Sequence, residues 1–279
     1  MRALAGWSAF ARLEWGEVRR SRWLALTFGC YLVLGAMLVV AGTRESSVFG
    51  YTGMARTLLS FAHVLLVVLP LLALSATTQV LPRAREDGSL ELFFAQPLSR
   101  AGYLVGISLS RMLALSLPFV GTQLVLAGLG RLWFAEPIAW PMLARTLSIG
   151  LSLLWCFTGI GLLVSVQTRA QAKAVVYGLL AWALSVALVD VALLAVLLQW
   201  KLHARVVFFL AAINPVQLAR LGLLAGIEPD LTSLGPVGFY LATQLGAGVL
   251  SWLGALGPLA VGTGCWLLAS RRFARGDLM

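Results

Sequence analysis

The sequence has few charged residues: 11% of its 279 residues are charged, 60% are hydrophobic, and the mean hydropathy is +0.90. This shortage of charge excludes an ordinary soluble domain and indicates an integral membrane protein. Lysine is nearly absent, since only Lys173 and Lys201 occur and neither follows a glycine-rich turn. No GxxxxGK[ST] stretch is present, so the chain has no P-loop with which to bind ATP.

Cysteine and histidine are also scarce. The three cysteines, Cys30, Cys156 and Cys265, form no CxxC pair, so the sequence indicates neither a disulfide framework nor a zinc site. The cysteines and methionines are soft metal ligands that also serve as packing residues in membrane helices, so the sequence assigns no metal site. The sequence has no HExxH, DxxxD or nucleophile elbow, which argues against an intramembrane enzyme, the alternative from another class.

The apolar residues gather into runs that are long enough to cross a bilayer core of about 30 Å. They predict an all-α membrane protein with six transmembrane helices. The spans are Trp23–Gly42, Leu58–Leu81, Tyr103–Leu129, Leu147–Val166, Ala174–Leu198 and Phe239–Ala269. No internal repeat, linker or second soluble domain interrupts this pattern, so residues 1–279 are expected to form one membrane domain.

The basic residues orient the chain, because cytoplasmic loops hold the excess of Lys and Arg. The N-terminal segment, the loops after the second and fourth spans and the C-terminal tail contain most of the 21 basic residues. Both termini are therefore predicted to be cytoplasmic. The net charge of +10 follows from this topology, and we expect no nucleic-acid partner.

One polar stretch between the second and third spans, REDGSLELFFAQPLSR (85–100), has the pattern of a short amphipathic helix. Asp87 or Ser89 is the expected N-cap. The apolar face comprises Leu90, Phe93, Phe94 and Pro97. Acidic and amide residues flank it: Glu86, Asp87, Glu91 and Gln96. A short helix needs a surface to lie on, and its acidic start favours a protein partner over anionic lipid, which is the alternative.

Two further segments outside the spans have helical patterns. The stretch RALAGWSAFARLEWGEVRRSRW (2–23) predicts an N-terminal interfacial helix on the inner leaflet of the lipid bilayer. Between the fifth and sixth spans, two short helices are expected on the outer side. One of these helices is predicted to start with Asn214 as N-cap, Pro215 at the first helical position and Gln217 three residues after the cap. It is predicted to end at Gly226.

Two ionisable residues inside predicted spans are candidates for a role, because such groups are costly in hydrocarbon. Asp190 in the fifth span lines a transport path, forms a structural salt bridge with Arg205 or Arg220, or stays protonated. His63 in the second span is either a proton or metal ligand or a hydrogen-bonded helix residue.

The stretches ARLEWGEVRRSRW, REDGSLELFFAQPLSR and RRFARGDLM resemble the permease subunits of type-2 ABC exporters over the full chain. Within that family, LVDVALLAVLL and INPVQLARLG are similar to the permeases of ABC complexes that mature the copper sites of nitrous oxide reductase. This resemblance implies a homodimer in the bacterial or archaeal inner membrane. It also implies a separate cytosolic ATPase subunit that binds ATP, so that this chain holds no cofactor.

The resemblance further implies roles for the two non-spanning helical segments. The cytoplasmic loop would be a coupling helix that docks on the ATPase through Glu86, Asp87, Gly88, Leu90, Glu91, Phe93 and Phe94. Asn214, Pro215 and Gln217 would belong to an outer gate that meets a periplasmic partner, whereas a surface hairpin without a gate role is the alternative. The transported substrate is either a species for copper-site assembly or, in a general exporter, a drug, lipid or antimicrobial peptide.

Overall fold

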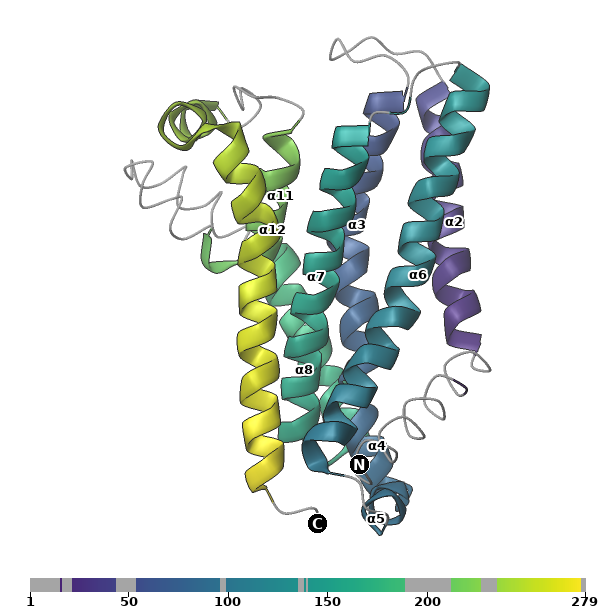
Figure 1. Ribbon diagram of the computed structural model, residues 1–279, viewed down its shortest axis with the longest axis vertical. Helices are drawn as coiled ribbons and strands as arrows, with labels where there is room; N and C mark the ends of the chain where they lie inside the picture. The colour runs from purple at the N-terminus through teal and green to yellow at the C-terminus, as the bar shows by residue number, and fades with distance from the viewer. Residues whose placement is uncertain are drawn as a thin grey trace, which may run out of the picture.

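A computed structural model describes residue 16 and residues 22–43, 54–95, 99–134, 138, 140–188, 212–226 and 235–276. Every regular element in these residues is a helix (Figure 1). The long helices are α2 (Arg22–Thr43), α3 (Met54–Thr77), α6 (Arg100–Phe134), α7 (Trp140–Gln167) and α12 (Gly235–Arg275). The shorter elements are α4 (Val80–Glu86), α5 (Ser89–Phe94), α8 (Gln171–Ala183), the π-helical turn η1 (Leu184–Leu188) and α11 (Pro215–Leu224). The all-helical prediction is confirmed.

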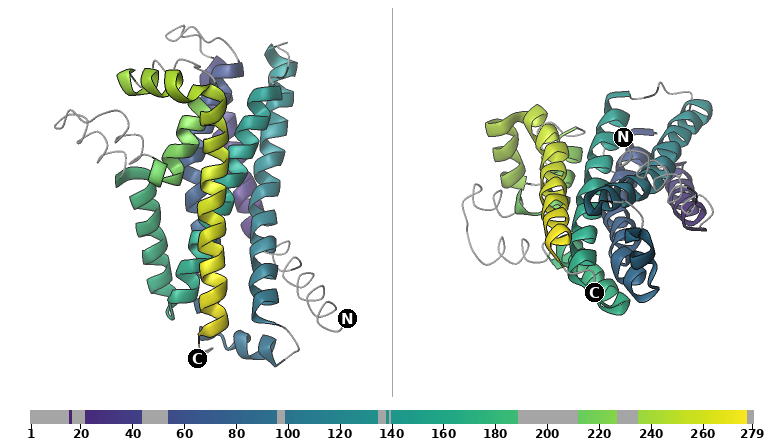
Figure 2. Two further views of the ribbon diagram at one scale, coloured as in Figure 1. Left: turned by 60° about the vertical axis from the view of Figure 1, so that its left-hand side comes forward. Right: turned by 60° about the horizontal axis from the view of Figure 1, so that its bottom comes forward.

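The long helices run roughly side by side, with α7 between α3 and α12 and with α2 beside α6 (Figures 1 and 2). At one end of this bundle lie α4 and α5, and this end is called the α4–α5 end. Toward the other end lie α11 and residues 235–245 of α12, and this end is called the α11 end (Figure 1). The two ends are built differently, and each contains one of the segments that the sequence predicted to be functional.

Four helices in the described part of the chain are long and apolar enough to cross a membrane: Val64–Glu86, Arg100–Leu129, Trp140–Gln167 and Gly246–Arg275. Helix formation satisfies their backbone groups internally, as hydrocarbon requires. The other two predicted spans fall on α2, whose side chains are described only in part, and on α8 with η1, after which residues 189–211 lie outside the described residues. The count of six spans therefore stays a prediction.

A break divides α12 within the predicted sixth span. Gly246 has φ 75° and ψ 153°, a conformation that only glycine adopts readily, and it breaks α12 into two helices. Residues 235–245 lie across the end of the bundle, and the long helix runs from Gly246 onward (Figure 2, left). The start of the sixth span at Phe239 stays a prediction, and apolar content alone did not reveal the break at Gly246.

Most of the apolar core lies along α7, which touches α3, α6, α11 and α12. Glycine allows the closest approaches. A Cβ atom at Gly159 of α7 would collide with the carbonyl of Gly262 on α12, and one at Gly254 of α12 would lie 2.7 Å from the Cα atom of Gly222 on α11. Small residues at such contacts are typical of helix packing in membranes.

The helical turn before the proline of α3 accepts a hydrogen bond from α8. Pro70 lacks an N–H group and disturbs the hydrogen bonds of the preceding helical turn. In that turn the carbonyl of Val67 accepts a hydrogen bond from the indole Nε1 of Trp182 on α8, at 3.0 Å. This contact holds the far end of α8 against the middle of α3.

Candidate coupling site

The α4–α5 segment (residues 80–94) turns a corner at Gly88. This residue has φ 70°, in the left-handed region, and is the N-cap of α5. The N–H groups of Asp87 and Gly88 donate to the carbonyls of Arg83 and Arg85, which closes the end of α4. A glycine is favoured here because the corner needs a positive φ.

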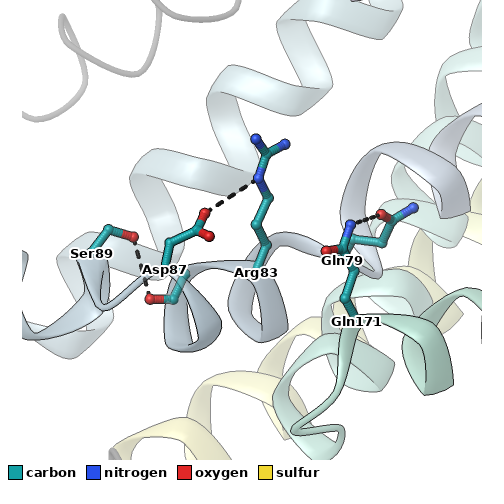
Figure 3. Close-up of polar contacts among 6 residues, drawn as sticks. Gln79, Arg83, Asp87, Ser89 and Gln171 are labelled. Carbon is teal, nitrogen blue, oxygen red and sulfur yellow. Dashed lines mark hydrogen bonds and ion pairs between the residues drawn. The ribbon is translucent and has the colours of Figure 1, made fainter.

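The predicted N-cap of this helix, Asp87 or Ser89, is wrong, since neither side chain caps α5. The carboxylate of Asp87 instead pairs with Nε of Arg83 at 3.5 Å, and Oγ of Ser89 donates to the carbonyl of Ala84 at 3.3 Å (Figure 3). Both side chains contact α4 instead. Gly88, in its left-handed conformation, is therefore the N-cap of α5. The predicted helix itself is confirmed from Ser89 to Phe94, with Glu91 in its first turn.

The apolar face of α5 packs on the chain itself. Leu90 is only 2% exposed, and Phe93 and Phe94 join Tyr103 of α6 and Phe273 of α12 in an aromatic cluster. Ring centroids in this cluster lie 5.5–6.1 Å apart, within the range of favourable aromatic pairs. The apolar face of this short helix therefore lies on α6 and α12.

The opposite face of the segment is open to solvent. Glu86, Asp87 and Glu91 are exposed, and Leu92, which follows Glu91, is 72% exposed. The sequence analysis did not select Leu92, although a lone leucine on the acidic side of an amphipathic helix is a detectable signal. The exposed surface thus combines negative charge with one large apolar side chain.

Polar contacts fasten this segment to the turn between α7 and α8. Arg85 Nη1 donates to the carbonyl of Thr168 at 2.7 Å, and the carboxylate of Glu86 accepts from the backbone N–H of Gln171 at 2.8 Å. Because Gln171 is the first residue of α8, whose N-cap Ala170 offers no side-chain cap, Glu86 acts as that cap from another helix. Gln171 Nε2 also donates to Oε1 of Gln79 at 2.7 Å (Figure 3).

A second fastening joins the first residue of α6 to the last turn of α12. Arg100 Nη1 donates to the carbonyls of Phe273, Ala274 and Gly276, at 3.2, 3.0 and 2.7 Å. The last carbonyls of a helix have no donor within that helix, so the guanidinium of Arg100 acts as a cap for the end of α12. The α4–α5 segment is thereby joined to α6, α7, α8 and α12 by direct contacts.

At the α11 end, the predicted helix start is confirmed. Asn214 Oδ1 accepts from the N–H of Val216 at 2.9 Å, Pro215 occupies the first helical position, and α11 ends two residues before Gly226. Asn214 and Gln217 are both 6% exposed, and α11 packs on α3, α7 and α12. The α11 part of the predicted segment is therefore a buried helix and not a surface hairpin. Residues 199–211 and 227–234 of that segment lie outside the described residues.

Asn214 makes a second contact that the sequence analysis missed. Its Nδ2 donates to the carbonyl of Ser185, in the π-helical turn that follows α8, at 2.6 Å. One side chain therefore caps α11 and holds the end of α8. No sequence signal indicates this pairing, because a π-helical turn has no pattern comparable to a cap.

The remaining candidates are described only in part. His63 belongs to α3, but its side chain is outside the described residues, as are Asp190, its candidate partner Arg205 and the predicted N-terminal interfacial helix. Cys30, Cys156 and Cys265 are free thiols. Within the described residues, no group of three or more His, Cys, Asp or Glu side chains could hold a metal ion.

A helical membrane bundle whose polar loop is fixed to several spans is an arrangement suited to a transporter subunit driven by a partner. The chain belongs to the ABC-2 family of transporter proteins, whose family model matches residues 8–278. It is a membrane-embedded permease, and this is a family of transporter subunits rather than of enzymes.

Two relatives are similar over most of their length, and both are named probable ABC transporter permease protein NosY. The one from Stutzerimonas stutzeri is 28% identical over 263 residues, which cover 90% of this chain and 92% of the relative. The one from Pseudomonas aeruginosa is 28% identical over 270 residues, which cover 90% of this chain and 95% of the relative. The resemblance drawn from the loop and tail motifs is confirmed by these matches.

Proposed function

We propose that the chain is the permease of an ABC transporter in which a separate cytosolic ATPase drives a homodimer of six-span subunits through the α4–α5 segment. Both chain termini and the α4–α5 end then face the cytoplasm. The ATPase binds ATP, and this chain supplies no cofactor. Family membership supports the transporter class and an ABC ATPase partner.

The observation that supports this proposal best is the two-sided character of α5. Its buried face, Leu90 with Phe93 and Phe94, lies on α6 and α12, while its other face presents Glu91 and Leu92 to solvent. A helix that is fixed on one side and exposed on the other transmits a push from a docked partner to the spans beneath it. The exposed acids suit a basic rim on the partner, and Leu92 suits an apolar pocket within that rim.

The coupling residues then divide into two groups. Glu86, Asp87 and Glu91 belong to the docking surface, together with Leu92. Leu90, Phe93 and Phe94 transmit the movement through the aromatic cluster, and Gly88 allows the corner on which α5 turns. This division extends the sequence-based hypothesis, which treated all seven of its residues as one contact surface.

The α11 end is proposed to form the outer gate and to meet a periplasmic partner. Asn214, Pro215 and Gln217 define the first turn of α11, which is buried against three other helices, so a movement of those helices also moves α11. The nature of the transported species follows from the resemblance alone: we propose a role in copper-site maturation of nitrous oxide reductase. Export of a drug, lipid or antimicrobial peptide is the second candidate.

Co-purification of the full-length permease with its ABC ATPase tests the docking surface. We expect Leu92→Asp and Glu91→Lys each to lower the recovered ATPase at least about tenfold, the change expected when a contact worth about 1.4 kcal/mol is lost. Leu132→Asp is the matched control, because Leu132 is 79% exposed at the opposite end of α6. Equal ATPase recovery from all three variants would remove the docking assignment.

Phe94→Ala tests the transmitting role separately. This change opens the aromatic cluster without altering the exposed face, so the ATPase should remain bound while its stimulated turnover falls severalfold. Turnover equal to that of the unsubstituted complex would show that the cluster does not transmit the movement.

A further inference from the structure

We infer that α8 mechanically links the α4–α5 end to the α11 end, with Glu86 and Asn214 as the positioning residues at its two ends. The inference rests on the proposed function, because it names the helix through which a push on the α4–α5 segment reaches α11. It concerns hydrogen bonds between elements that are far apart in the sequence.

At its first residue, α8 depends on the α4–α5 segment. The N–H of Gln171 donates to the carboxylate of Glu86 at 2.8 Å, and the side chain of Gln171 bonds to Gln79. The first N–H groups of a helix have no acceptor within the helix, and a negative charge there is favoured by the helix dipole. Movement of Glu86 therefore displaces the start of α8 or leaves its first turn without a cap.

At its other end, α8 continues into η1, and the carbonyl of Ser185 in this turn accepts from Nδ2 of Asn214 at 2.6 Å. Asn214 is 6% exposed and also caps α11 through its Oδ1. A shift of Ser185 therefore pulls directly on the residue from which α11 starts.

Between the contacts of Gln171 and Ser185, the chain is helical with one irregular turn. Residues 171–183 are α-helical and residues 184–188 are π-helical. Trp182 donates to the carbonyl of Val67 at 3.0 Å, which provides a lateral contact with α3 close to the π-helical turn. Single π-helical turns are rare and are frequently found at functional sites, and conversion to α-helix would rotate everything beyond the turn.

Interconversion of this turn between π-helix and α-helix would supply the two discrete arrangements that coupling between distant sites requires. Axial or rotational movement of α8 is resisted at three points, near Gln171, Trp182 and Ser185. Loss of either terminal contact should loosen the other end, because a coupling free energy acts equally in both directions.

Hydrogen exchange of the full-length chain in lipid nanodiscs, measured by mass spectrometry, tests this reciprocity without the ATPase. In Glu86→Ala, we expect exchange to become about fivefold faster both in residues 171–175 and in residues 215–224, as for the loss of one hydrogen bond. Glu86→Gln keeps an oxygen acceptor for Gln171 and should keep both rates close to those of the unsubstituted protein. Glu91→Ala, which removes an exposed acid of the neighbouring helix, should change neither region.

The reverse direction is tested with Asn214→Ser. Serine is a good N-cap, so the start of α11 keeps its acceptor, but the shorter side chain does not reach the carbonyl of Ser185. We expect faster exchange in residues 171–175, at the opposite end of α8 from the contact with Asn214. Asn214→Ala removes both contacts and should accelerate exchange in α11 more strongly.

Purely local changes, confined to 171–175 in Glu86→Ala and to 212–224 in Asn214→Ser, would overturn the link. This outcome is separate from a failure of the proposed function. If the ATPase does not depend on Leu92 or Glu91 while the exchange changes remain reciprocal, the docking assignment fails and the link through α8 stands.

Discussion

The two ends of the bundle are held by different kinds of contact. At the α4–α5 end, four aromatic rings and several hydrogen bonds between side chains and backbone groups join helices that are distant in sequence. At the α11 end, the backbones themselves approach closely at Gly222 and Gly254, and one asparagine supplies two hydrogen bonds. Rings and long side chains tolerate small displacements, whereas backbone contacts do not. In the proposed function, the α4–α5 end would receive a push and the α11 end would respond as a unit.

The largest expected effect concerns the sidedness of the two ends. Single cysteines at Ser99, just before α6, and at Leu132, in its last turn, should react with a membrane-impermeant thiol reagent from opposite sides in a chain without its native cysteines. The residue at position 99 should react only from the cytoplasmic side, because the basic loops lie there. Reaction of both from one side would contradict the topology and the roles given to the two ends.

The aromatic cluster should dominate the stability of the α4–α5 end. Phe273 is 3% exposed and touches Phe94 and Tyr103, so Phe273→Ala should lower the free energy of unfolding by about 3 kcal/mol. Leu268→Ala on the same helix is the control, since Leu268 is 50% exposed. Equal thermal stability of the two purified variants would show that the cluster is not well packed.

The contact between Gly222 and Gly254 should dominate the stability of the α11 end, with a smaller effect than that of the aromatic cluster. A Cβ atom at Gly254 would lie 2.7 Å from Gly222 Cα and 2.9 Å from the carbonyl of Leu218, so Gly254→Ala should cost about 2 kcal/mol through overpacking. Gly248→Ala serves as the reference, because nothing lies within 4 Å of its added methyl group. The measurement is thermal unfolding of both variants in the same detergent. If Gly254→Ala is as stable as Gly248→Ala, the proposed difference between the two ends of the bundle is wrong.

The smallest expected effect is at the break in α12. Gly246 has φ 75° with no atom within 4 Å of an added Cβ, so Gly246→Ala is strained only by its backbone conformation and should cost about 1 kcal/mol. Gly264→Ala in the same helix has open space and a negative φ, and should be neutral or slightly stabilising. If the two alanine variants unfold at the same temperature, the break is not held by its glycine.

The sequence predicted the helices and the start of α11 because these depend on local signals. Apolar runs identify membrane helices, and Asn214 with Pro215 forms a cap that is recognisable over a few residues. The acidic loop was also recognisable as a helix, since Leu90, Phe93 and Phe94 have helical spacing.

What the sequence did not predict depends on partners distant in the chain. Nothing local shows that Phe93 and Phe94 meet Phe273, or that Glu86 caps α8. Gly88 was selected only through the family resemblance, while its left-handed φ displaced the expected cap at Asp87 or Ser89. Gly246 lies within an apolar run, so its conformation had no visible counterpart in the hydrophobic pattern.

The contacts of Arg100 form only after the C-terminal part of the chain has been synthesised. This residue begins α6, but the three carbonyls that it binds lie between Phe273 and Gly276, more than half of the chain later. The ribosome must therefore complete α12 before the aromatic cluster and its arginine cap close beneath α5. A nascent chain that stops before α12 would expose Phe93, Phe94 and Tyr103, which offers chaperones and membrane proteases a means of recognising unfinished subunits before an ATPase docks on them.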